Sequence, residues 1–301
     1  MKKIIAFLIV LIGLIWFGIN PDKSFDELAP IYAQSPSKFM DVSGQNVHYR
    51  DEGEGFPIVL IHGTGASLHT WDEWTKKLTE THRVIRFDLP AYGLTGMDSE
   101  KRYSLDDYRV FLDTFLNHLG VEKFHLAGNS LGGAVSWLYA SHYPKKVDKL
   151  ILIDPSGFPG RSTPGVIQLA KTPLLNQFVR YMTPRFFIEK NLKEVYEDDR
   201  LITDELINRY WDLTRYSGNR QAFIDRAKLP TVDSSPRLQY IESPTLILWG
   251  DKDAWIPVEN ALKFDQAISQ STVVILPDAG HVPMEEFPLE SVKIALDFLE
   301  N

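Results

Sequence analysis

The chain has 301 residues, 44% of them hydrophobic and 24% charged, an ordinary globular composition that is long enough to bury a large core. Its net charge of −8 and the lack of any lysine- or arginine-rich block argue against nucleic acid as a partner. Because there is no cysteine, a disulfide framework, a thiolate metal site and a cysteine nucleophile are all excluded.

The N-terminus departs from this average composition. Lys2 and Lys3 precede an almost unbroken apolar run from Ile4 to Ile19. A charged start before an apolar stretch indicates a secretory signal or an uncleaved signal anchor. No small-x-small cleavage site follows directly, so we interpret residues 1–20 as a membrane anchor, with a cleaved signal and secretion as the alternative. By the positive-inside rule the lysines stay cytoplasmic, and the rest of the chain faces the periplasm or the cell surface.

The next segments predict a tether and the first strands. Residues 21–38 contain three prolines and scattered charge, which indicates a linker. Two strand-like segments, 39–42 and 47–50, flank a short polar turn and predict a β-hairpin. The continuous apolar run 57–61 is typical of a strand buried on both faces.

Similar apolar runs recur along the chain and alternate with amphipathic segments. The runs are 83–87, 124–127, 149–153, 245–249 and 272–276. The helical patterns lie near 68–80, 104–119, 130–142, 258–269 and 289–300. This alternation predicts an α/β fold with a mostly parallel sheet that helices cover on both faces.

One interval breaks the alternation. Residues 158–240 have helical periodicity, punctuated by prolines, and no comparable strand run. We interpret this interval as a helical cap inserted into a core formed by residues 39–157 and 241–301.

A serine lies in the turn between a predicted strand and a predicted helix. Gly128-Asn129-Ser130-Leu131-Gly132 matches G-x-S-x-G, the nucleophile elbow. Such a sharp turn strains the serine backbone and requires small residues two positions away. It also presents the serine Oγ near a helix N-terminus, where developing negative charge is stabilised. We therefore predict that Ser130 is a nucleophile and not part of an ordinary strand–helix turn.

A serine nucleophile needs a base and a carboxylate. His281 lies on a loop directly after the last predicted strand, which favours it as the base. Asp253 follows the preceding strand and is preferred to Asp251, which is well placed to close the turn. Asp154 ends another strand and is the alternative carboxylate. The chain order Ser130, Asp253, His281 is the one expected for this architecture.

Two backbone N–H groups must stabilise the oxyanion that forms during attack. We assign them to Leu131, directly after the nucleophile, and to Thr64 in the loop 62–66, with Gly65 as the alternative to Thr64. This loop lacks the glycine spacing of nucleotide-binding loops. No metal ion or organic cofactor is expected.

Five motifs in chain order resemble those of the α/β-hydrolase fold superfamily, over residues 39–301. They are His62-Gly63, Asp88-Leu89-Pro90-Ala91-Tyr92-Gly93, the elbow, Gly250-Asp251-Lys252-Asp253, and Gly280-His281 followed by Glu285-Glu286-Phe287-Pro288. The resemblance implies an esterase- or lipase-like serine hydrolase with a helical cap. Ala91 stands where this superfamily usually has a glycine.

The resemblance is specific for the fold and much less specific for the substrate. Haloalkane dehalogenases and epoxide hydrolases are similar, including the cap, but use an aspartate in place of Ser130. C–C bond hydrolases of ring-cleavage products have a similar elbow but typically carry a tryptophan where this chain has Val282. We therefore expect hydrolysis of carboxylic esters, with C–C hydrolysis or non-catalytic ligand binding as alternatives.

The cap is expected to set specificity. Phe158 and Trp211 in the cap, and Trp255 next to the carboxylate, are the predicted substrate contacts. The expected partners are a small-molecule ester or lipid and, through the N-terminal segment, a membrane. The sequence does not determine the oligomeric state.

Overall fold

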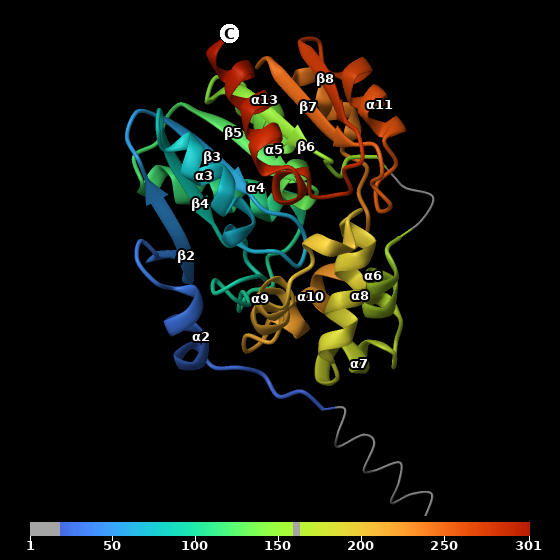
Figure 1. Ribbon diagram of the computed structural model, residues 1–301. Helices are drawn as coiled ribbons and strands as arrows, with labels where there is room; N and C mark the ends of the chain where they lie inside the picture. Colours follow the sequence, from blue (N-terminus) through green and yellow to red (C-terminus); the bar gives the residue numbers. More distant parts are fainter. Residues whose placement is uncertain (1–18, 159–162) are drawn as a thin grey trace, which may run out of the picture.

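In the computed structural model, which describes residues 19–158 and 163–301, the described chain forms one sheet of eight strands (Figure 1). The strands are β1 (Lys38–Val42), β2 (Gln45–Glu52), β3 (Phe56–Ile61), β4 (His82–Phe87), β5 (Phe124–Asn129), β6 (Val147–Ile153), β7 (Thr245–Gly250) and β8 (Ser271–Leu276). Their order in the sheet is β1-β2-β4-β3-β5-β6-β7-β8. The pairs β1–β2 and β2–β4 are antiparallel, and every other pair is parallel. The prediction of a mostly parallel α/β sheet is confirmed.

Burial explains why these runs are strands. Every residue of β5 and β7 is buried, as expected for central parallel strands that are covered on both faces. The strand β8 lies at the edge of the sheet, and all of its residues except Leu276 are exposed or half-exposed. Each predicted strand has its counterpart, and its ends differ by at most two residues, because apolar runs mark burial better than they mark hydrogen-bonded ends.

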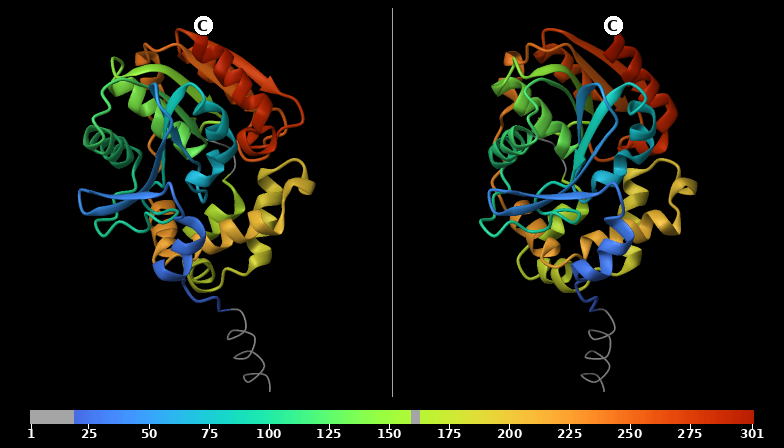
Figure 2. Two further views of the ribbon diagram at one scale, coloured as in Figure 1. Left: turned by 60° about the vertical axis from the view of Figure 1, so that its left-hand side comes forward. Right: turned by 90° about the vertical axis from the view of Figure 1, so that its left-hand side faces the viewer.

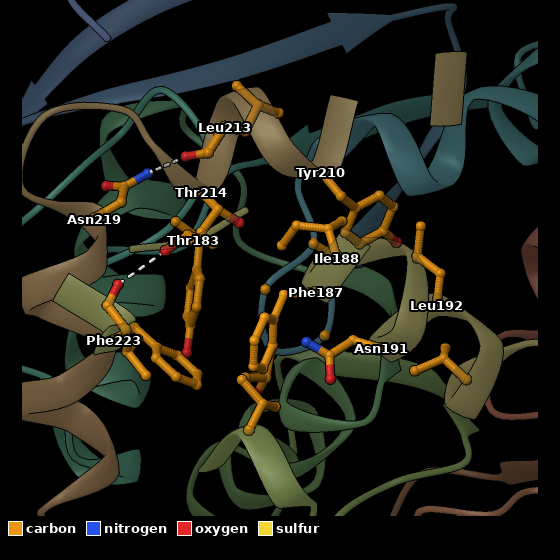
Figure 3. Close-up of a pocket in the computed structure, with 18 of the residues that line it drawn as sticks. Thr183, Phe187, Ile188, Asn191, Leu192, Tyr210, Leu213, Thr214, Asn219 and Phe223 are labelled. Atoms are coloured by element: carbon orange, nitrogen blue, oxygen red, sulfur yellow. Dashed lines mark hydrogen bonds between the residues drawn. The ribbon is translucent and has the colours of Figure 1, made fainter. Parts of the chain in front are cut away.

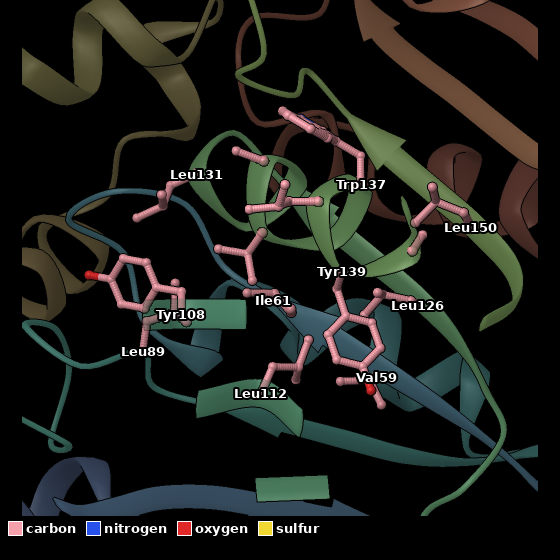
Figure 4. Close-up of a cluster of buried hydrophobic side chains, with 14 of the residues drawn as sticks. Val59, Ile61, Leu89, Tyr108, Leu112, Leu126, Leu131, Trp137, Tyr139 and Leu150 are labelled. Atoms are coloured by element: carbon pink, nitrogen blue, oxygen red, sulfur yellow. The ribbon is translucent and has the colours of Figure 1, made fainter. Parts of the chain in front are cut away.

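Helices cover the two faces of the sheet. The core helices are α3 (Asp72–Leu78), α4 (Leu105–His118), α5 (Leu131–His142), α11 (Glu259–Ala267), α12 (Pro283–Glu286) and α13 (Pro288–Glu300), with short 3-10 turns at Leu68–Trp71 and Ser235–Tyr240. One core cluster joins α4, α5 and α11 to the sheet, and a second joins α3 and α13 to its other face. Figure 4 shows the first cluster, where Leu112 of α4 and Tyr139 of α5 meet Val59 of β3. These two layers make the rigid scaffold of the site.

A group of helices connects β6 to β7 and is called the cap below. Its members are α6 (Gly165–Lys171), α7 (Asn176–Tyr181), α8 (Arg185–Val195), α9 (Asp204–Thr214) and α10 (Asn219–Ala227), with a 3-10 turn at Asp199–Leu201. The described residues of this interval include no named strand, as the periodicity predicted. In Figures 1 and 2 the cap stands at one end of the sheet. The carboxyl ends of β5, β7 and β8 point to the cap, and the segments that follow these strands carry Ser130, Asp253 and His281.

The prediction that residues 21–38 form a tether is wrong. Helix α2 (Phe25–Tyr32) forms the middle of this segment and begins with a capping box. The Glu27 N–H donates to Ser24 Oγ at 3.3 Å, and Glu27 Oε2 accepts from the Ser24 N–H at 2.8 Å. The spacing S-x-x-E could have revealed the helix start, but three prolines obscured it.

Helix α2 also packs against the rest of the protein. Leu28 is fully buried in a small cluster with Leu94 and Leu213. Just before the helix, the Lys23 N–H donates to Arg215 O at 2.7 Å, and Lys23 O accepts from the Ser217 N–H at 3.0 Å. The segment therefore joins the core and the cap.

We expect Leu28→Ala to lower the free energy of unfolding by about 2–4 kcal/mol, because it removes buried methyl groups and leaves a cavity. The matched control is Ile31→Ala on the same helix, where the side chain is 56% exposed. That change should shift stability by less than about 0.5 kcal/mol. Thermal and denaturant unfolding measure both. Equal, negligible effects of the two changes would mean that α2 does not hold the fold together.

The predicted anchor, residues 1–20, lies almost wholly outside the described residues. Among the helices within 19–158 and 163–301, none combines the length and apolarity needed to cross a membrane.

Candidate active site

Ser130 lies between the last residue of β5 and the first residue of α5. Its backbone has φ 54° and ψ −114°, a conformation that side chains other than glycine rarely adopt. The turn is held by the Ser130 N–H, which donates to Ile153 O at 3.0 Å, and by Ser130 O, which accepts from the Ala134 and Ser156 N–H groups. These bonds fix the strained residue at the end of the sheet.

The two glycines of the elbow are required by close packing. A Cβ on Gly128 would overlap the Gly132 carbonyl, and a Cβ on Gly132 would overlap the carbonyl of Ile61. The helix therefore starts directly against the sheet, and its free N–H groups surround the serine.

His281 and Asp253 form a hydrogen-bonded pair. His281 Nδ1 lies 2.7 Å from Asp253 Oδ2, and the two side chains are 3% and 0% exposed. The other oxygen, Asp253 Oδ1, accepts from the N–H groups of Trp255 and Ile256 at 2.8 and 2.9 Å. This leaves His281 Nε2 buried, with no hydrogen-bond partner among the described residues. The imidazole is thus oriented by the carboxylate and has one nitrogen free to take a proton.

The histidine loop is fixed from two sides. The His281 N–H donates to Val195 O in the cap at 2.8 Å, and His281 O accepts from Asn129 Nδ2 at 3.0 Å. Asn129 Nδ2 also donates to Ile153 O at 3.2 Å. The residue before the serine therefore positions the loop of the base, a role that the sequence alone did not reveal.

Asp251 and Asp154 both lie near this pair. Asp251 Oδ1 accepts from the Asp278 N–H at 2.7 Å, which closes the turn between the β7 and β8 loops. Asp154 is fully buried after β6 and accepts from the Gly250 N–H at 3.0 Å. Burial, and next the charge of Asp253, raise the pKa of Asp154 well above its usual range. The protonated, neutral form of Asp154 is therefore favoured.

Asp154, Asp253 and His281 lie close enough together to resemble a metal site. One ligand atom each of Asp154, Asp253 and His281 lies within 4.8 Å of the others. Two of these ligand atoms are already paired, because His281 Nδ1 and Asp253 Oδ2 lie 2.7 Å apart.

The predicted oxyanion donors lie on the two sides of the serine. Thr64, with Gly65 next to it at φ 77°, lines the cavity described below. Leu131 is the first residue of α5, where an N–H group has no partner within the helix. Thr64 lies in a turn and Leu131 in the first turn of α5, so the two predicted donors are held by regular backbone structure.

Buried polar groups support the Thr64 loop. His62 Nδ1 donates to Gly63 O at 2.7 Å, and His62 Nε2 accepts from the Leu89 N–H at 3.0 Å. Burial lowers the pKa of His62, which is consistent with this neutral tautomer. Asp88 accepts from the Leu68 N–H at 2.7 Å and from the Leu94 N–H at 2.8 Å. The loop is thus set by fixed hydrogen bonds.

Asp88 remains charged in this network. Burial opposes its ionisation, but the facing His48, at 2.7 Å, outweighs burial and lowers the pKa of Asp88 to about 2. Ala91, which follows Asp88 in the same loop, has φ 82°, a left-handed backbone conformation that glycine adopts more readily than alanine.

A cavity joins these groups to the cap. Ser130, His281, Thr64 and Trp255 line it from the core, and apolar side chains of α7 to α10 line it from the cap. Figure 3 shows this wall: Phe187, Ile188 and Leu192 of α8, Tyr210 and Leu213 of α9, and Phe223 of α10. A largely apolar chamber above a serine–histidine pair suits an acyl or aromatic group.

Two of the three predicted substrate contacts lie elsewhere. Trp255 does line the cavity, with its ring 5.6 Å from that of His281. Phe158 instead packs edge-on against Phe264, with ring centres 5.0 Å apart. Trp211 donates its indole N–H to Thr183 O at 2.7 Å and lines a second, more polar cavity beside α2. Composition alone did not reveal which face of α9 looks toward Ser130.

The structure brings other residues to the cavity that the sequence did not single out. They are Asn191, Tyr210, Asn219, Arg220 and Phe223. Helical phase is the signal that could have found Tyr210, because it is three residues from Leu213 on the inner face of α9.

Three comparisons place this arrangement among known proteins. Residues 57–288 match a family model described as the alpha/beta hydrolase fold. A 2-hydroxy-6-oxo-6-phenylhexa-2,4-dienoate hydrolase of Comamonas testosteroni is 29% identical over 284 residues, which are 88% of this chain and 96% of that hydrolase. Lipase 1 of Psychrobacter immobilis is 31% identical over 260 residues, or 81% of this chain and 77% of the lipase.

The fold of this chain is also similar to that of a solved hydrolase structure. The crystal structure of a membrane phospholipase A, described as a bacterial virulence factor, matches with a TM-score of 0.78 at 26% identity and covers 100% of this chain and 98% of its own. The elbow at Ser130, the sheet order and the matched family model together lead to one conclusion: the chain belongs to the α/β hydrolase fold family.

Proposed function

We propose that the protein is a serine hydrolase that cleaves carboxylic esters, as an esterase or lipase, through an acyl-enzyme on Ser130. The observation that carries this proposal is the His281 pair. One ring nitrogen is held by the buried Asp253, while the other is buried, has no partner among the described residues, and belongs to a side chain that lines the same cavity as Ser130. That is the arrangement in which a histidine activates a serine.

The reaction has two steps. His281 Nε2 takes the Ser130 hydroxyl proton as Oγ attacks the acyl carbon, and the oxyanion accepts hydrogen bonds from the Thr64 and Leu131 N–H groups. The C–O bond then breaks, and the alkoxide leaves with the proton from His281. Water then attacks the acyl-enzyme and gives a proton to His281, and His281 passes that proton to Ser130 Oγ as the acid is released. Asp253 stabilises the imidazolium in both steps.

Hydrolysis of a C–C bond in a dienoate is the second candidate. One observation favours it: Arg220 lines the cavity, and its Nη1 is buried without a partner among the described residues, so it could receive a carboxylate. However, the same guanidinium already pairs with Asp22 Oδ1 at 2.6 and 3.0 Å. The remaining cap wall of the cavity is mostly apolar, which favours a neutral ester.

Two measurements test the proposal. A fluorophosphonate probe should label the protein stoichiometrically at Ser130, and p-nitrophenyl esters from acetate to palmitate should be hydrolysed. Labelling without ester turnover, together with cleavage of a 6-oxo-dienoate, would transfer the assignment to C–C hydrolysis. Neither labelling nor turnover would favour a ligand-binding protein without catalysis.

The wall of the cavity gives a prediction on chain length. Leu192 on α8 is 3% exposed and lines the cavity. Leu192→Trp fills this space, so kcat/KM for p-nitrophenyl octanoate should fall by about 10–200-fold relative to the acetate ester. Trp211→Phe is the control, and should leave the ratio unchanged because Trp211 lies outside this cavity. If Trp211→Phe changes the octanoate-to-acetate ratio and Leu192→Trp does not, Trp211 contacts the acyl chain and Leu192 does not.

We further propose that residues 1–20 anchor the protein in a membrane, with the catalytic domain outside the cytoplasm. The support is the apolar run from Ile4 to Ile19 after two lysines. N-terminal sequencing of protein from the membrane fraction tests this proposal. An intact N-terminus in that fraction is expected, whereas a soluble protein that begins after residue 20 would show signal cleavage.

A further inference from the structure

Exposed apolar side chains are concentrated in one stretch of the cap. They belong to α7, to the start of α8 and to the turn before α7, and are called the cap face: Leu174, Leu175, Phe178, Tyr181 and Phe186, with exposed fractions of 83%, 45%, 50%, 47% and 64%. Large apolar groups this exposed, and this close together in the chain, mark an interaction surface on a water-soluble domain.

The stretch of chain that carries the cap face is basic, although the whole chain is acidic. Residues 163–192 contain four basic side chains and one acidic side chain, whereas the chain as a whole has a net charge of −8. Lys171, Arg180 and Lys190 are exposed there. The Arg180 guanidinium lies 5.0 Å from the centre of the Tyr181 ring. Aromatic and basic side chains around an apolar surface are the composition that favours an anionic lipid interface.

The N-terminal segment meets the protein at the same face. The Asn20 N–H donates to Tyr181 O at 3.0 Å, and Asn20 O accepts from Arg220 Nη2 at 2.8 Å. Ile19, at the start of the described chain, is 44% exposed. In Figures 1 and 2 this start lies on the side of the cap that is remote from the sheet. The apolar run that ends at Ile19 therefore reaches the protein beside Tyr181.

The cap face is continuous with the cavity above Ser130. Phe178 is half-exposed on the cap face and also lines the cavity. Phe187, next to Phe186 with ring centres 5.3 Å apart, is 38% exposed and lines the cavity as well. The two phenylalanines provide an apolar path from the outside of the cap to the serine.

We propose that the cap face rests on the surface of an anionic lipid bilayer, and that acyl substrates pass from the lipid between Phe178 and Phe187 to Ser130. The bilayer is the occupant that accounts for the three observations together: the apolar and basic composition, the position of Asn20, to which the N-terminal apolar run connects, beside Tyr181, and the cavity-lining phenylalanines Phe178 and Phe187. The docking stands without the proposed ester hydrolysis, whereas the entry of substrate rests on it.

The absence of cysteine permits a direct test of docking. Single variants Leu174→Cys and Phe186→Cys of the full chain are labelled with an environment-sensitive fluorophore and reconstituted with phosphatidylcholine–phosphatidylglycerol vesicles. The controls are Leu262→Cys on α11 and Leu289→Cys on α13, which are 60% and 66% exposed and belong to core helices outside the cap. Lipids that carry a quencher on the acyl chain should quench the two cap labels at least threefold more than the two controls.

Two outcomes overturn the docking. Equal quenching at all four positions means that the cap face does not touch lipid. A change of the cap labels that appears without vesicles and grows with protein concentration means that a second copy of the chain covers this face.

The substrate path is tested by activity. Leu174→Asp combined with Phe186→Asp should lower hydrolysis of an ester dissolved in vesicles by about tenfold or more, and should leave a soluble acetate ester within twofold of wild type. Leu262→Asp combined with Leu289→Asp is the matched control, and should change neither rate. An equal loss on both substrates would contradict the path. If the wild type cleaves no ester, the proposed function fails, while the quenching result still decides the docking.

Discussion

Ser130→Ala should lower kcat/KM for a p-nitrophenyl ester by roughly 10⁴–10⁶-fold. The change removes the atom that forms the acyl-enzyme, while the strained backbone at φ 54° stays in place. Fluorophosphonate labelling should disappear together with the activity. Steady-state kinetics on freshly purified protein, with circular dichroism to verify the fold, measures the effect.

The control for this change is Ser269→Ala, at an exposed serine remote from the elbow. It should keep full activity. His281→Ala should cost about as much as Ser130→Ala, and the double variant little more than either, because the two residues act as one unit. If the fold-losses in kcat/KM of the two single variants multiply in the double variant, His281 does not activate Ser130.

Asp253→Asn should lower kcat/KM by about 10³–10⁴-fold, because the amide can no longer hold the imidazole in the productive tautomer or stabilise the imidazolium. Asp253 is the carboxylate that lies 2.7 Å from His281 Nδ1. Its second oxygen is fixed by two backbone N–H groups, so an asparagine fits the same space.

Asp154→Asn is the matched control for Asp253→Asn, and should stay within about tenfold of wild type. Burial raises the pKa of Asp154 and so favours its protonated form, for which a neutral amide is the closest replacement. The Gly250 N–H keeps an acceptor in either case. A severe loss in Asp154→Asn with an active Asp253→Asn would reverse the assignment of the acid.

The local patterns of the sequence predicted most of the sheet. Buried parallel strands are short apolar runs, so β3 to β8 could be recognised one by one, and the alternation with amphipathic segments predicted their parallel arrangement. The same logic predicted the turn at Ser130, because its two glycines are demanded by contacts within a few residues and with the neighbouring strand. The prediction of a tether was wrong because two signals conflicted. Three prolines indicated a linker, whereas the capping box at Ser24 indicated a helix start.

The site residues were also predicted only in part from the sequence. Residue type and chain order alone pointed to Ser130, Asp253 and His281. Only the tertiary structure showed that Asp253, and not Asp154, bonds the imidazole, because both aspartates end neighbouring strands and the choice depends on side-chain distances. It also showed that Trp211 turns away from the cavity while Tyr210 lines it.

By itself, then, the sequence determined the strands, the elbow and the candidate nucleophile and base, because each of these depends on the neighbours of a residue along the chain. The tertiary structure decided the cavity, the acid partner and the exposed cap face. Those features arise where α7 to α10 pack over loops that lie far away in the sequence. A pattern of apolar residues predicts that a helix buries one side, but the partner on that side is set by the packing of the whole chain.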